Sequence, residues 1–441
     1  MSAFPPPDPV AQALNARFGP EFGAVFAGEG AFTLAPLLAT LSALGDPHLA
    51  LPPVIHIAGT NGKGSTAAFC RAILAAAGLT VHAFTQPHLL QTTERIALAG
   101  EPITQDGLLA MIDRVAMVAA PGLSHFEAQT ACAFLAFAET RADFVILEVG
   151  VGGKDDATNV IPAPAVSVIT RIGADHTALL GPTLPLIARA KAGVIKPQSP
   201  VITAPQDDPA IDRVFEAAAA RARSPLLMGG VDWTVGPAEE GFFLDTESAS
   251  YHLPQPALPG PHQLENAALA ALACLALDNP GITEDAVARG LLAARNPGRL
   301  QRLRKGPLAR RAEIENCALF VDGGHNALAA AALRTWANTE PPAPWALVIG
   351  MLADKDAKAF FHSLGHTMQI VVALEPKGPR PAMPSTALRR AARTEGLEAV
   401  AASSLSEAVS IAGRALARPG KVLITGSLAL ASEAVHSELL A

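Results

Sequence analysis

The sequence predicts an α/β protein in which mostly parallel, doubly wound sheets are covered by helices. Two observations carry this prediction. Short apolar segments of β type alternate with Ala- and Leu-rich helical stretches, and a glycine-rich turn joins one apolar segment, residues 54–57, directly to a helix. The chain has 441 residues, of which 50% are hydrophobic. At roughly 100–200 residues per domain, we expect two or three domains with a large core.

The first series of elements ends near residue 295. The helix that follows the turn is expected over 65–77, and it stops at Gly78 because glycine readily takes the left-handed conformation that ends a helix. A group of short segments between 231 and 253 predicts a small antiparallel insertion. The remaining expected strands lie at 81–85, 143–149, 165–172 and 200–204, and the remaining helices at 261–277 and 283–294.

The second series begins after Asn296-Pro-Gly-Arg299, a run of Pro and Gly that marks a domain boundary. We therefore expect one domain over 1–295 and another over 296–441. Ser404-Leu-Ser-Glu407 is typical of the start of a helix in this part of the chain. The expected strands lie at 319–322, 345–351, 369–375 and 421–425, with helices between them.

Composition excludes several classes of protein. No apolar run reaches the ~18 residues of a membrane-spanning helix, and the N-terminus lacks the basic and apolar regions of a secretory signal. A net charge of −7 argues against a nucleic-acid partner. We expect a cytoplasmic protein without a membrane partner. The cysteines are widely spaced, in apolar contexts, and are expected to be reduced core residues: Cys70, Cys132, Cys274 and Cys317.

The turn after residues 54–57, Gly59-Thr-Asn-Gly-Lys-Gly-Ser-Thr66, is the strongest indication of function. Its glycines let backbone N–H groups approach a phosphate, and the N-terminus of the next helix adds partial positive charge. Lys63 can reach the β- and γ-phosphates, and a hydroxyl from Ser65 or Thr66 can bind Mg²⁺. The alternative is a glycine-rich loop that only makes a tight turn. The expected nucleotide contacts are Thr60, Asn61, Gly62, Lys63, Gly64, Ser65 and Thr66.

Further strings follow this loop in an order that resembles the Mur ligase superfamily and, within it, the folylpolyglutamate synthases and dihydrofolate synthases. The resemblance covers nearly the whole chain. The strings are Gln86-Pro-His-Leu89, Glu94-Arg-Ile96, Phe126-Glu127, Leu147-Glu-Val-Gly150, Gly153-Lys-Asp-Asp-Ala-Thr-Asn159, Asp175-His-Thr177, Ala190-Lys-Ala-Gly-Val-Ile-Lys196, His262-Gln-Leu-Glu-Asn266, Pro297-Gly-Arg299, Asp322-Gly-Gly-His-Asn326, Asp354-Lys-Asp356 and Thr425-Gly-Ser427.

The resemblance implies a P-loop ATPase-like Mur ligase central domain at the N-terminus and a smaller Rossmann-like α/β domain at the C-terminus, with ATP bound between them. It implies an ATP-dependent ligase that joins L-glutamate to 7,8-dihydropteroate and extends tetrahydrofolate with γ-linked glutamates. The folate-side carboxylate would be phosphorylated by ATP, and the glutamate nitrogen would then displace phosphate. We expect a monomer whose partners are these small molecules.

Magnesium would neutralise charge on the phosphates, and Glu148 is a candidate ligand because it ends an expected strand, where ligand sites of open α/β sheets gather. The alternative is a solvated acid at a strand end. The resemblance adds His176 and Lys191, the latter as N6-carboxylysine, because a carbamate is an anionic oxygen ligand whereas an ammonium repels the metal. The alternatives are a structural histidine and a lysine on a helix surface. With Ser65, this set would hold two Mg²⁺ ions.

Gln86 is a departure from the family, because relatives carry a serine that contacts magnesium before the Pro-His-Leu string. A glutamine can offer an amide oxygen as a Mg²⁺ ligand on a longer arm. His88 is expected to be structural or close to the substrate rather than a metal ligand.

The resemblance also suggests contacts for the nucleotide and the pteroate. Arg299 suits a bidentate phosphate contact and, with Lys63, would stabilise the transferring phosphoryl group. The alternative for Arg299 is an ordinary linker arginine.

Phe126 and Asp156 suit contacts with a flat, amide-like pterin. The alternative for Phe126 is packing in the core. The remaining nucleotide candidates are Asn266, Asp322, His325 and Lys355. The pteroate segments comprise Ser124, His125, Phe126 and Glu127 with Asp155, Asp156 and Ala157.

Two regions that touch the folate in relatives differ here: Gly153-Lys-Asp-Asp156 replaces Gly-Arg-Leu-Asp, and residues 32–36 lack Leu-Gly-Leu-Glu-Arg. Two other functions stay open. One is a cell-wall Mur ligase that acts on a UDP-muramoyl substrate, against which the Pro-His-Leu and Asp-Ala-Thr-Asn strings argue. The other is a P-loop ATPase without ligation, against which the separate acid, histidine and lysine set argues.

Overall fold

A computed structural model describes residues 8–21, 33–416 and 419–439. Contacts between Cα atoms divide the chain into two compact units. The N-terminal unit contains Pro7–Ala257 and Gln263–Arg295, and the C-terminal unit contains Leu258–His262 and Asn296–Ala441. Among the described residues, no helix is both long and apolar enough to cross a membrane.

The N-terminal unit is built on an eight-stranded sheet with the order β4-β3-β2-β5-β1-β6-β7-β8. Strands from β2 to β8 pair in parallel, whereas β3 and β4 add an antiparallel edge. The central strands β1 and β5 are buried along their whole length and are mostly apolar, because helices cover both faces of a parallel sheet. The strands are β1 (Val54–Ala58), β2 (Val81–Phe84), β3 (Ile96–Leu98), β4 (Glu101–Pro102), β5 (Phe144–Glu148), β6 (Val166–Ile169), β7 (Val201–Thr203) and β8 (Leu226–Met228).

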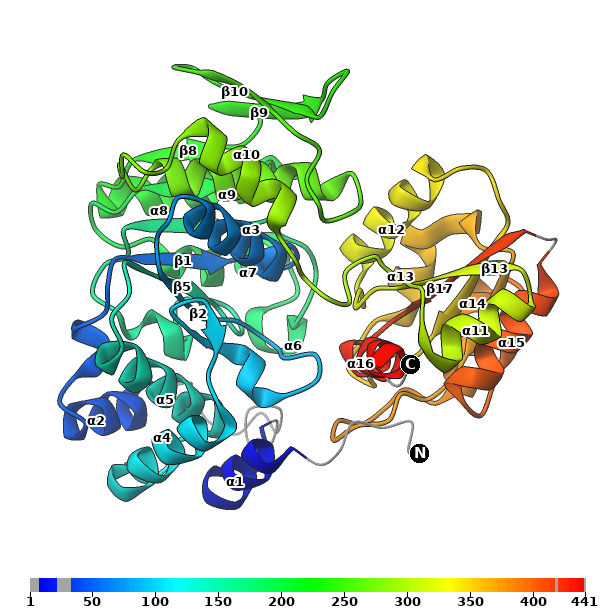
Figure 1. The fold of residues 1–441 in the computed structure, drawn as a ribbon, viewed down its shortest axis with the longest axis horizontal. Helices are drawn as coiled ribbons and strands as arrows, with labels where there is room; N and C mark the ends of the chain where they lie inside the picture. Colours follow the sequence, from blue (N-terminus) through cyan, green and yellow to red (C-terminus); the bar gives the residue numbers. More distant parts are fainter. Residues whose placement is uncertain (1–7, 22–32, 417–418, 440–441) are drawn as a thin grey trace. The chain divides into compact units, whose positions relative to one another are not determined.

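Helices α3, α9 and α10 lie on one face of this sheet, and α4 and α5 lie on the other (Figure 1). The helix α5 is buried along most of its length, and it forms a core with residues of β2 and β5 such as Phe84 and Leu147. The helices are α1 (Pro9–Phe18), α2 (Ala35–Ala43), α3 (Lys63–Ala76), α4 (Gln105–Val118), α5 (His125–Glu139), α6 (Thr177–Leu180), α7 (Leu184–Lys191), α8 (Pro209–Ala222), α9 (His262–Leu275) and α10 (Glu284–Ala293).

The expected antiparallel insertion forms a three-stranded sheet with the order β11-β10-β9. These strands are β9 (Trp233–Pro237), β10 (Phe242–Thr246) and β11 (Ser250–Leu253). In Figure 1 the labelled strands β9 and β10 lie beyond α9 and α10, away from the large sheet of the N-terminal unit.

The C-terminal unit has a six-stranded sheet with the order β12-β13-β17-β14-β15-β16. Only β12 is antiparallel to its neighbour. Phe320, Trp336 and Trp345 pack together in the core, with ring centroids 5.1–5.6 Å apart. The strands are β12 (Gln301–Leu303), β13 (Cys317–Val321), β14 (Trp345–Ile349), β15 (Ile370–Ala373), β16 (Ala399–Ala401) and β17 (Gly420–Thr425).

The helices of this unit are α11 (Gly306–Ile314), α12 (Ala327–Thr339), α13 (Ala357–Leu364), α14 (Ser385–Thr394), α15 (Leu405–Ala415) and α16 (Leu428–Leu439). The α/β prediction is confirmed in both units. Sequence reasoning missed the short strands at or next to the sheet edges, each of which has only two or three residues: β3, β4, β8, β12 and β16. All four cysteines are buried.

Candidate active site

The glycine-rich loop joins β1 to α3, and two of its glycines are required by close packing. A Cβ atom on Gly59, where φ is 142°, would lie 1.8 Å from Oγ1 of Thr170. A Cβ atom on Gly62, where φ is 94°, would lie 2.3 Å from Oδ1 of Asn266 on α9. Any larger residue would push the loop away from β6 or α9. The structure thus places Asn266, which the sequence suggested as a nucleotide contact, against the loop.

Two lysine ammonium groups donate to the same carbonyl oxygen of this loop. Lys63 Nζ lies 3.1 Å from the oxygen of Gly59, and Lys191 Nζ lies 2.7 Å from it. Lys191 is only 5% exposed. Burial, and then the charge of Lys63, lower the pKa of Lys191 to about 7, although Asp175 and Asp156 act in the opposite direction. Positive charge is therefore concentrated where the loop would receive phosphate.

The polar side chains around the start of α3 come from both α3 and α9. Ser65 is 5% exposed, and its hydroxyl accepts a hydrogen bond of 3.3 Å from Gln263. Asn266 donates to Gln263 in turn, at 2.9 Å. Oγ1 of Thr66 is buried without a hydrogen-bond partner. Thr60 fixes the other end of the loop, because its backbone N–H donates to Arg171 and its hydroxyl contacts Gly173.

Glu148 ends β5 directly beside β1, because the register of the two strands pairs it with Ile57. Its carboxylate is 3% exposed and accepts the backbone N–H of Gln86 at 3.0 Å. His176 lies in the left-handed conformation at the start of α6, and its N–H donates to Asp175. A carboxylate, a serine hydroxyl and a carbamate would be hard oxygen donors, which suit Mg²⁺. Within the described residues, no group of three or more His, Cys, Asp and Glu side chains could hold a metal ion.

A second polar cluster, the Arg95 network, comprises Arg95 with Glu21, Gln86, His88 and Gln129. Arg95 is 2% exposed and donates to His88 Nδ1 at 2.8 Å, Gln86 Oε1 at 3.0 Å and Gln129 Oε1 at 2.8 Å. It also forms an ion pair of 2.6 Å with Glu21. Burial, and then the charge of Arg95, lower the pKa of His88 to about 4, so this ring is neutral and accepts the hydrogen bond.

The Arg95 network changes the expected role of Gln86. The amide oxygen that the sequence suggested as a metal ligand accepts a hydrogen bond from Arg95 instead, and Nε2 is buried without a partner. The backbone N–H of Gln86, rather than its side chain, reaches Glu148. Sequence reasoning did not assign a role to Arg95, although it lies in the Glu94-Arg-Ile96 string.

The first pteroate segment forms the start of α5. Ser124 and Glu127 cap this helix reciprocally, since Glu127 N–H donates to Ser124 and Ser124 N–H donates to the Glu127 carboxylate. His125 contacts the carbonyl of Gly19 at 3.0 Å. Phe126 is half-buried and stacks on Phe84, with ring centroids 6.0 Å apart. These residues therefore shape one surface and also stabilise it.

The second pteroate segment is folded around Asp156, which is 5% exposed. Its carboxylate accepts backbone N–H bonds of 3.0 Å from Gly150, Val151 and Thr158, and a 2.6 Å bond from the Thr158 hydroxyl. Burial raises the pKa of Asp156, and these hydrogen bonds oppose the rise. His56 of β1 lies 2.9 Å from the same Thr158 hydroxyl. Asp156 thus holds this loop together. Asp155 beside it is exposed, and Ala157 is buried.

The nucleotide candidates of the C-terminal unit gather at the end of β13. Asp322 accepts N–H bonds from Leu300 at 3.0 Å and from Gly324 at 2.7 Å. Arg299 packs over Gly323, where an added Cβ would lie 2.4 Å from its Nη1. His325 contacts the Gly323 carbonyl at 3.0 Å. The structure therefore brings Arg299, Asp322 and His325 together around one turn. Lys355 follows β14, and its Nζ lies 3.9 Å from Asp354.

Comparison with known families matches residues 57–274 to the Mur ligase middle domain and residues 298–428 to the Mur ligase glutamate ligase domain. The chain is 34% identical to the dihydrofolate synthase/folylpolyglutamate synthase of Mycobacterium tuberculosis, over 91% of this chain and 89% of the relative.

Two solved structures share the fold along nearly the whole chain. Escherichia coli FolC in complex with DHPP and ADP superposes with a TM-score of 0.83 and 27% identity, over 98% of both chains. A bifunctional folylpolyglutamate synthase/dihydrofolate synthase with Mn, AMPPNP and L-glutamate bound gives a TM-score of 0.80 and 28% identity, over 92% of this chain and 94% of that one.

Proposed function

Because this chain belongs to the dihydrofolate synthase/folylpolyglutamate synthase family of Mur ligases, we propose that it is an ATP-dependent ligase of glutamate. It joins L-glutamate to 7,8-dihydropteroate and adds γ-linked glutamates to tetrahydrofolate. The observation that carries this proposal is the glycine-rich loop on which Lys63 and Lys191 converge, beside the strand-end acid Glu148. The fold of relatives that bind DHPP, ADP and L-glutamate supports the choice of substrates.

The reaction has two steps. A carboxylate oxygen of the folate attacks the γ-phosphorus of ATP, the bond to ADP breaks, and an acyl phosphate forms. The amino nitrogen of glutamate then attacks the acyl carbon, phosphate leaves, and the nitrogen loses a proton. Lys63 and Arg299 stabilise the negative charge on the transferring phosphoryl group, because fixed positive groups favour the more charged transition state. Thr60, Asn61, Gly62, Gly64 and Thr66 of the loop hold the phosphates, and Asn266 beside the loop contacts the nucleotide. Asp322 and His325 are the proposed nucleotide contacts of the C-terminal unit.

Magnesium supplies charge neutralisation for the phosphates when it is bound. Its proposed ligands are Ser65, Glu148, His176 and Lys191, in two sites. Lys191 becomes a metal ligand only after carbamylation. Its neutral amine attacks the carbon of CO₂ and releases one proton, which gives the anionic N6-carboxylysine. Its lowered pKa, about 7, supports this step because much of the amine is unprotonated near neutral pH. Carbamylation also removes the positive charge of Lys191, which is repelled by the positive charge of Lys63.

The pteroate rests against the exposed part of Phe126 at the start of α5, beside the loop that carries Asp155, Asp156 and Ala157. The stacking of Phe126 on Phe84 supports this placement, because a ring held in position by packing is a fixed platform for a flat pterin. Ser124, His125 and Glu127 support that platform through the helix cap and the contact with Gly19. We propose that the enzyme acts as a cytoplasmic monomer.

ADP release with defined acceptors tests the function. Enzyme, Mg²⁺, ATP and L-glutamate are incubated with dihydropteroate, tetrahydrofolate or UDP-muramoyl-alanine, and mass spectrometry identifies the product. We expect ADP release and a glutamylated product with the two folate acceptors. ADP release only with UDP-muramoyl-alanine would identify a cell-wall ligase, and release without any amide product would identify an ATPase. Either result would refute the proposal.

A further inference from the structure

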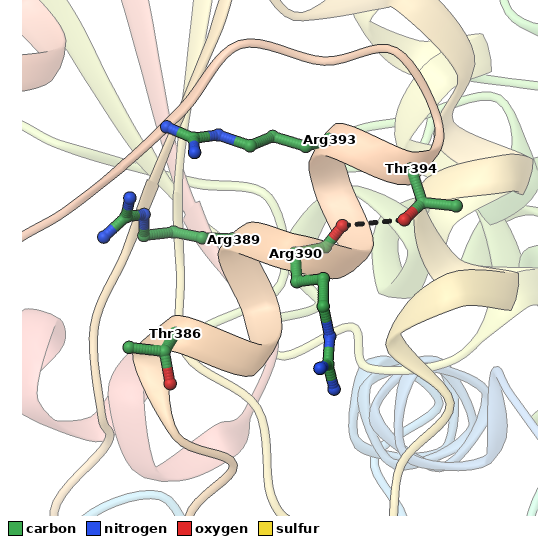
Figure 2. Close-up of a pocket in the computed structure, with 5 residues that line it drawn as sticks. All are labelled: Thr386, Arg389, Arg390, Arg393 and Thr394. Carbon is green, nitrogen blue, oxygen red and sulfur yellow. Dashed lines mark hydrogen bonds between the residues drawn. The ribbon is translucent and has the colours of Figure 1, made fainter.

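One helix of the C-terminal unit carries a cluster of positive charge that the proposed reaction does not use. We call it the α14 basic face; it consists of Thr386, Arg389, Arg390, Arg393 and Thr394. These residues line an open depression of about 400 Å³, within the size range of small-molecule sites. Figure 2 shows Arg389 and Arg393 extending toward the same side of α14, with Thr386 one turn before Arg389 and Arg390 pointing elsewhere.

The charge of this face is not neutralised within the described part of the chain. None of its three arginines forms an ion pair there, whereas Arg95, Arg114 and Arg171 each pair with a carboxylate. Arg393 donates to the Ala399 carbonyl at 2.8 Å. Nε of Arg389 is buried and has no acceptor. A buried donor without an acceptor is unfavourable, so this atom can take a hydrogen bond to an acceptor that the described residues do not supply.

The other side of α14 explains why the arginines stay in this arrangement. Leu388 and Ala392 are fully buried against the core of the C-terminal unit, so the helix cannot turn its arginines away from one another. Arg389 and Arg393 are separated by four residues, which makes them neighbours on the helix, and like charges at this spacing destabilise it slightly. A ligand with several negative charges would reverse this repulsion.

The helix also begins near the proposed nucleotide edge of the same unit. Ser385 N–H donates to Glu375, just beyond β15, and Met383 N–H donates to the carbonyl of Met351, just beyond β14. Because β13, β14 and β15 belong to one parallel sheet, these strand ends lie along the same edge as Asp322. The α14 basic face thus starts at the same edge of the C-terminal sheet as Asp322, the nucleotide contact proposed for this unit.

We propose that the α14 basic face binds the oligo-γ-glutamate chain of folate substrates and products. This inference rests on the proposed glutamate-ligating function, which makes a chain with one free carboxylate per residue. A γ-linked glutamate contributes five backbone bonds, so an extended chain presents a carboxylate about every 6 Å. Residues four apart on a helix are also about 6 Å apart along its axis. The spacing of Arg389 and Arg393 therefore matches that of successive carboxylates, which rotation about the CH₂–CH₂ bonds of the chain can bring to one side, and guanidinium groups bind carboxylates in a bidentate manner.

Such a site makes affinity depend on chain length. A folate with a single glutamate carries an α-carboxylate and the γ-carboxylate that reacts, so it leaves one carboxylate for the two arginines, whereas each added glutamate offers one more. Exposed ion pairs are individually weak, so we expect about a 2–5-fold gain in affinity for each arginine engaged. The gain should shrink at high salt, because ions screen exposed charges beyond a Debye length.

The test uses the full-length protein and a fluorescently labelled γ-linked pentaglutamate, with binding followed by anisotropy. The test variant is the double substitution Arg389→Gln/Arg393→Gln. The control is Arg310→Gln/Arg311→Gln, which removes the same charge from two exposed positions of α11. We expect the test variant to bind the pentaglutamate about 10-fold more weakly than wild type, and the control to bind within about 2-fold of it.

A second measurement separates this inference from the proposed function. ADP release with dihydropteroate should be unchanged in the test variant, while the distribution of products made from tetrahydrofolate should shift to shorter chains. Absent ADP release in wild type would refute the ligase function. Normal ADP release, with equal pentaglutamate binding and equal product lengths in wild type and test variant, would overturn the inference alone. Duplex DNA that binds more tightly than pentaglutamate, and loses binding in the test variant, would reassign the face to nucleic acid and also overturn it.

Discussion

Two polar regions of the N-terminal unit hold buried positive charge in opposite ways. In the Arg95 network, one guanidinium contacts a carboxylate, two amide oxygens and a neutral imidazole, so each of its three nitrogen atoms has a partner. Around the glycine-rich loop, the ammonium groups of Lys63 and Lys191 share the carbonyl of Gly59, and the positive charge of Lys63 lowers the pKa of Lys191.

The difference separates charge that supports the fold from charge that is held ready for a ligand. A buried cation with complete partners stabilises its surroundings and has little capacity for another anion. Two cations that face one carbonyl repel each other, and an incoming phosphate relieves that repulsion. Removing a cation should therefore harm catalysis at the loop and stability in the Arg95 network.

The largest effect is expected for Lys63→Ala. Because Lys63 is proposed to stabilise the transferring phosphoryl group, kcat/KM for dihydropteroate should fall by about 10³-fold, equivalent to about 4 kcal/mol. The free energy of unfolding should stay close to that of wild type, since the substitution also removes the repulsion of Lys191. Steady-state ADP release and urea unfolding measure the two quantities. Arg71→Ala, which removes an exposed charge from the same helix, is the control; normal turnover in Lys63→Ala would refute the role of the loop lysine.

Arg95→Met should produce the opposite pattern. It leaves Glu21 without its buried partner, and breaking a buried ion pair costs about 3–5 kcal/mol of unfolding free energy. The matched control is Arg114→Met, whose partner Glu139 is exposed, so its cost should stay below about 1 kcal/mol. Urea unfolding of both variants provides the comparison. If Arg95→Met and Arg114→Met lost the same free energy of unfolding, the Arg95 network would be no more important to the fold than a surface ion pair.

Lys191 should also make the stability of the protein depend on pH, which distinguishes the lysines of the loop from the fully paired Arg95. Its folded pKa of about 7 lies below the ordinary value of 10.5, so between these values the unfolded chain binds more protons than the folded one. The free energy of unfolding should therefore rise with pH across this window, by about 2 kcal/mol from pH 7 to 9. Below pH 7, the full cost of burying the protonated Lys191 is present. Urea unfolding in CO₂-free buffer measures the rise. Lys191→Met should lack it; an identical pH profile in the variant would contradict the assignment.

The smallest effect is expected for Gln86→Leu. The substitution removes one hydrogen bond of the Arg95 network but keeps the backbone N–H that donates to Glu148, so stability should fall by about 1 kcal/mol. Binding of Mn²⁺ with an ATP analogue, followed by electron paramagnetic resonance, should change by less than about 3-fold, since the side chain acts on the site only through its backbone. A loss of ten-fold or more would assign the amide oxygen as a direct metal ligand.

The arrangement of the glycine-rich loop could be predicted from sequence because its parts are adjacent in the chain. A strand, three glycines, a lysine and three hydroxyl side chains lie within residues 54–66, and local geometry alone brings them together. The Arg95 network could not be predicted in this way. Its partners at positions 21, 86 and 129 come from three separate segments, and only the tertiary fold makes them neighbours.

Asp156 illustrates a different limit. The sequence predicted it as a contact of the pterin, yet a carboxylate in a glycine-containing loop can either bind a ligand or accept hydrogen bonds from the loop's own N–H groups. Which of these it does depends on backbone directions at Gly150, Val151 and Thr158, and all three N–H groups point to it. Residue type predicted that Asp156 matters, whereas the hydrogen-bond pattern was needed to say how.

The close approach of Gly62 to Asn266 has a consequence for how the protein is made. The loop emerges early in synthesis, but the helix that packs on it, α9, lies about 200 residues further along the chain. The two cannot meet until translation has passed residue 275. A nascent chain, or a fragment truncated before α9, would carry the complete glycine motif and still lack one wall of the nucleotide site. The segment that is easiest to recognise in the sequence is therefore one of the later parts of the N-terminal unit to be completed.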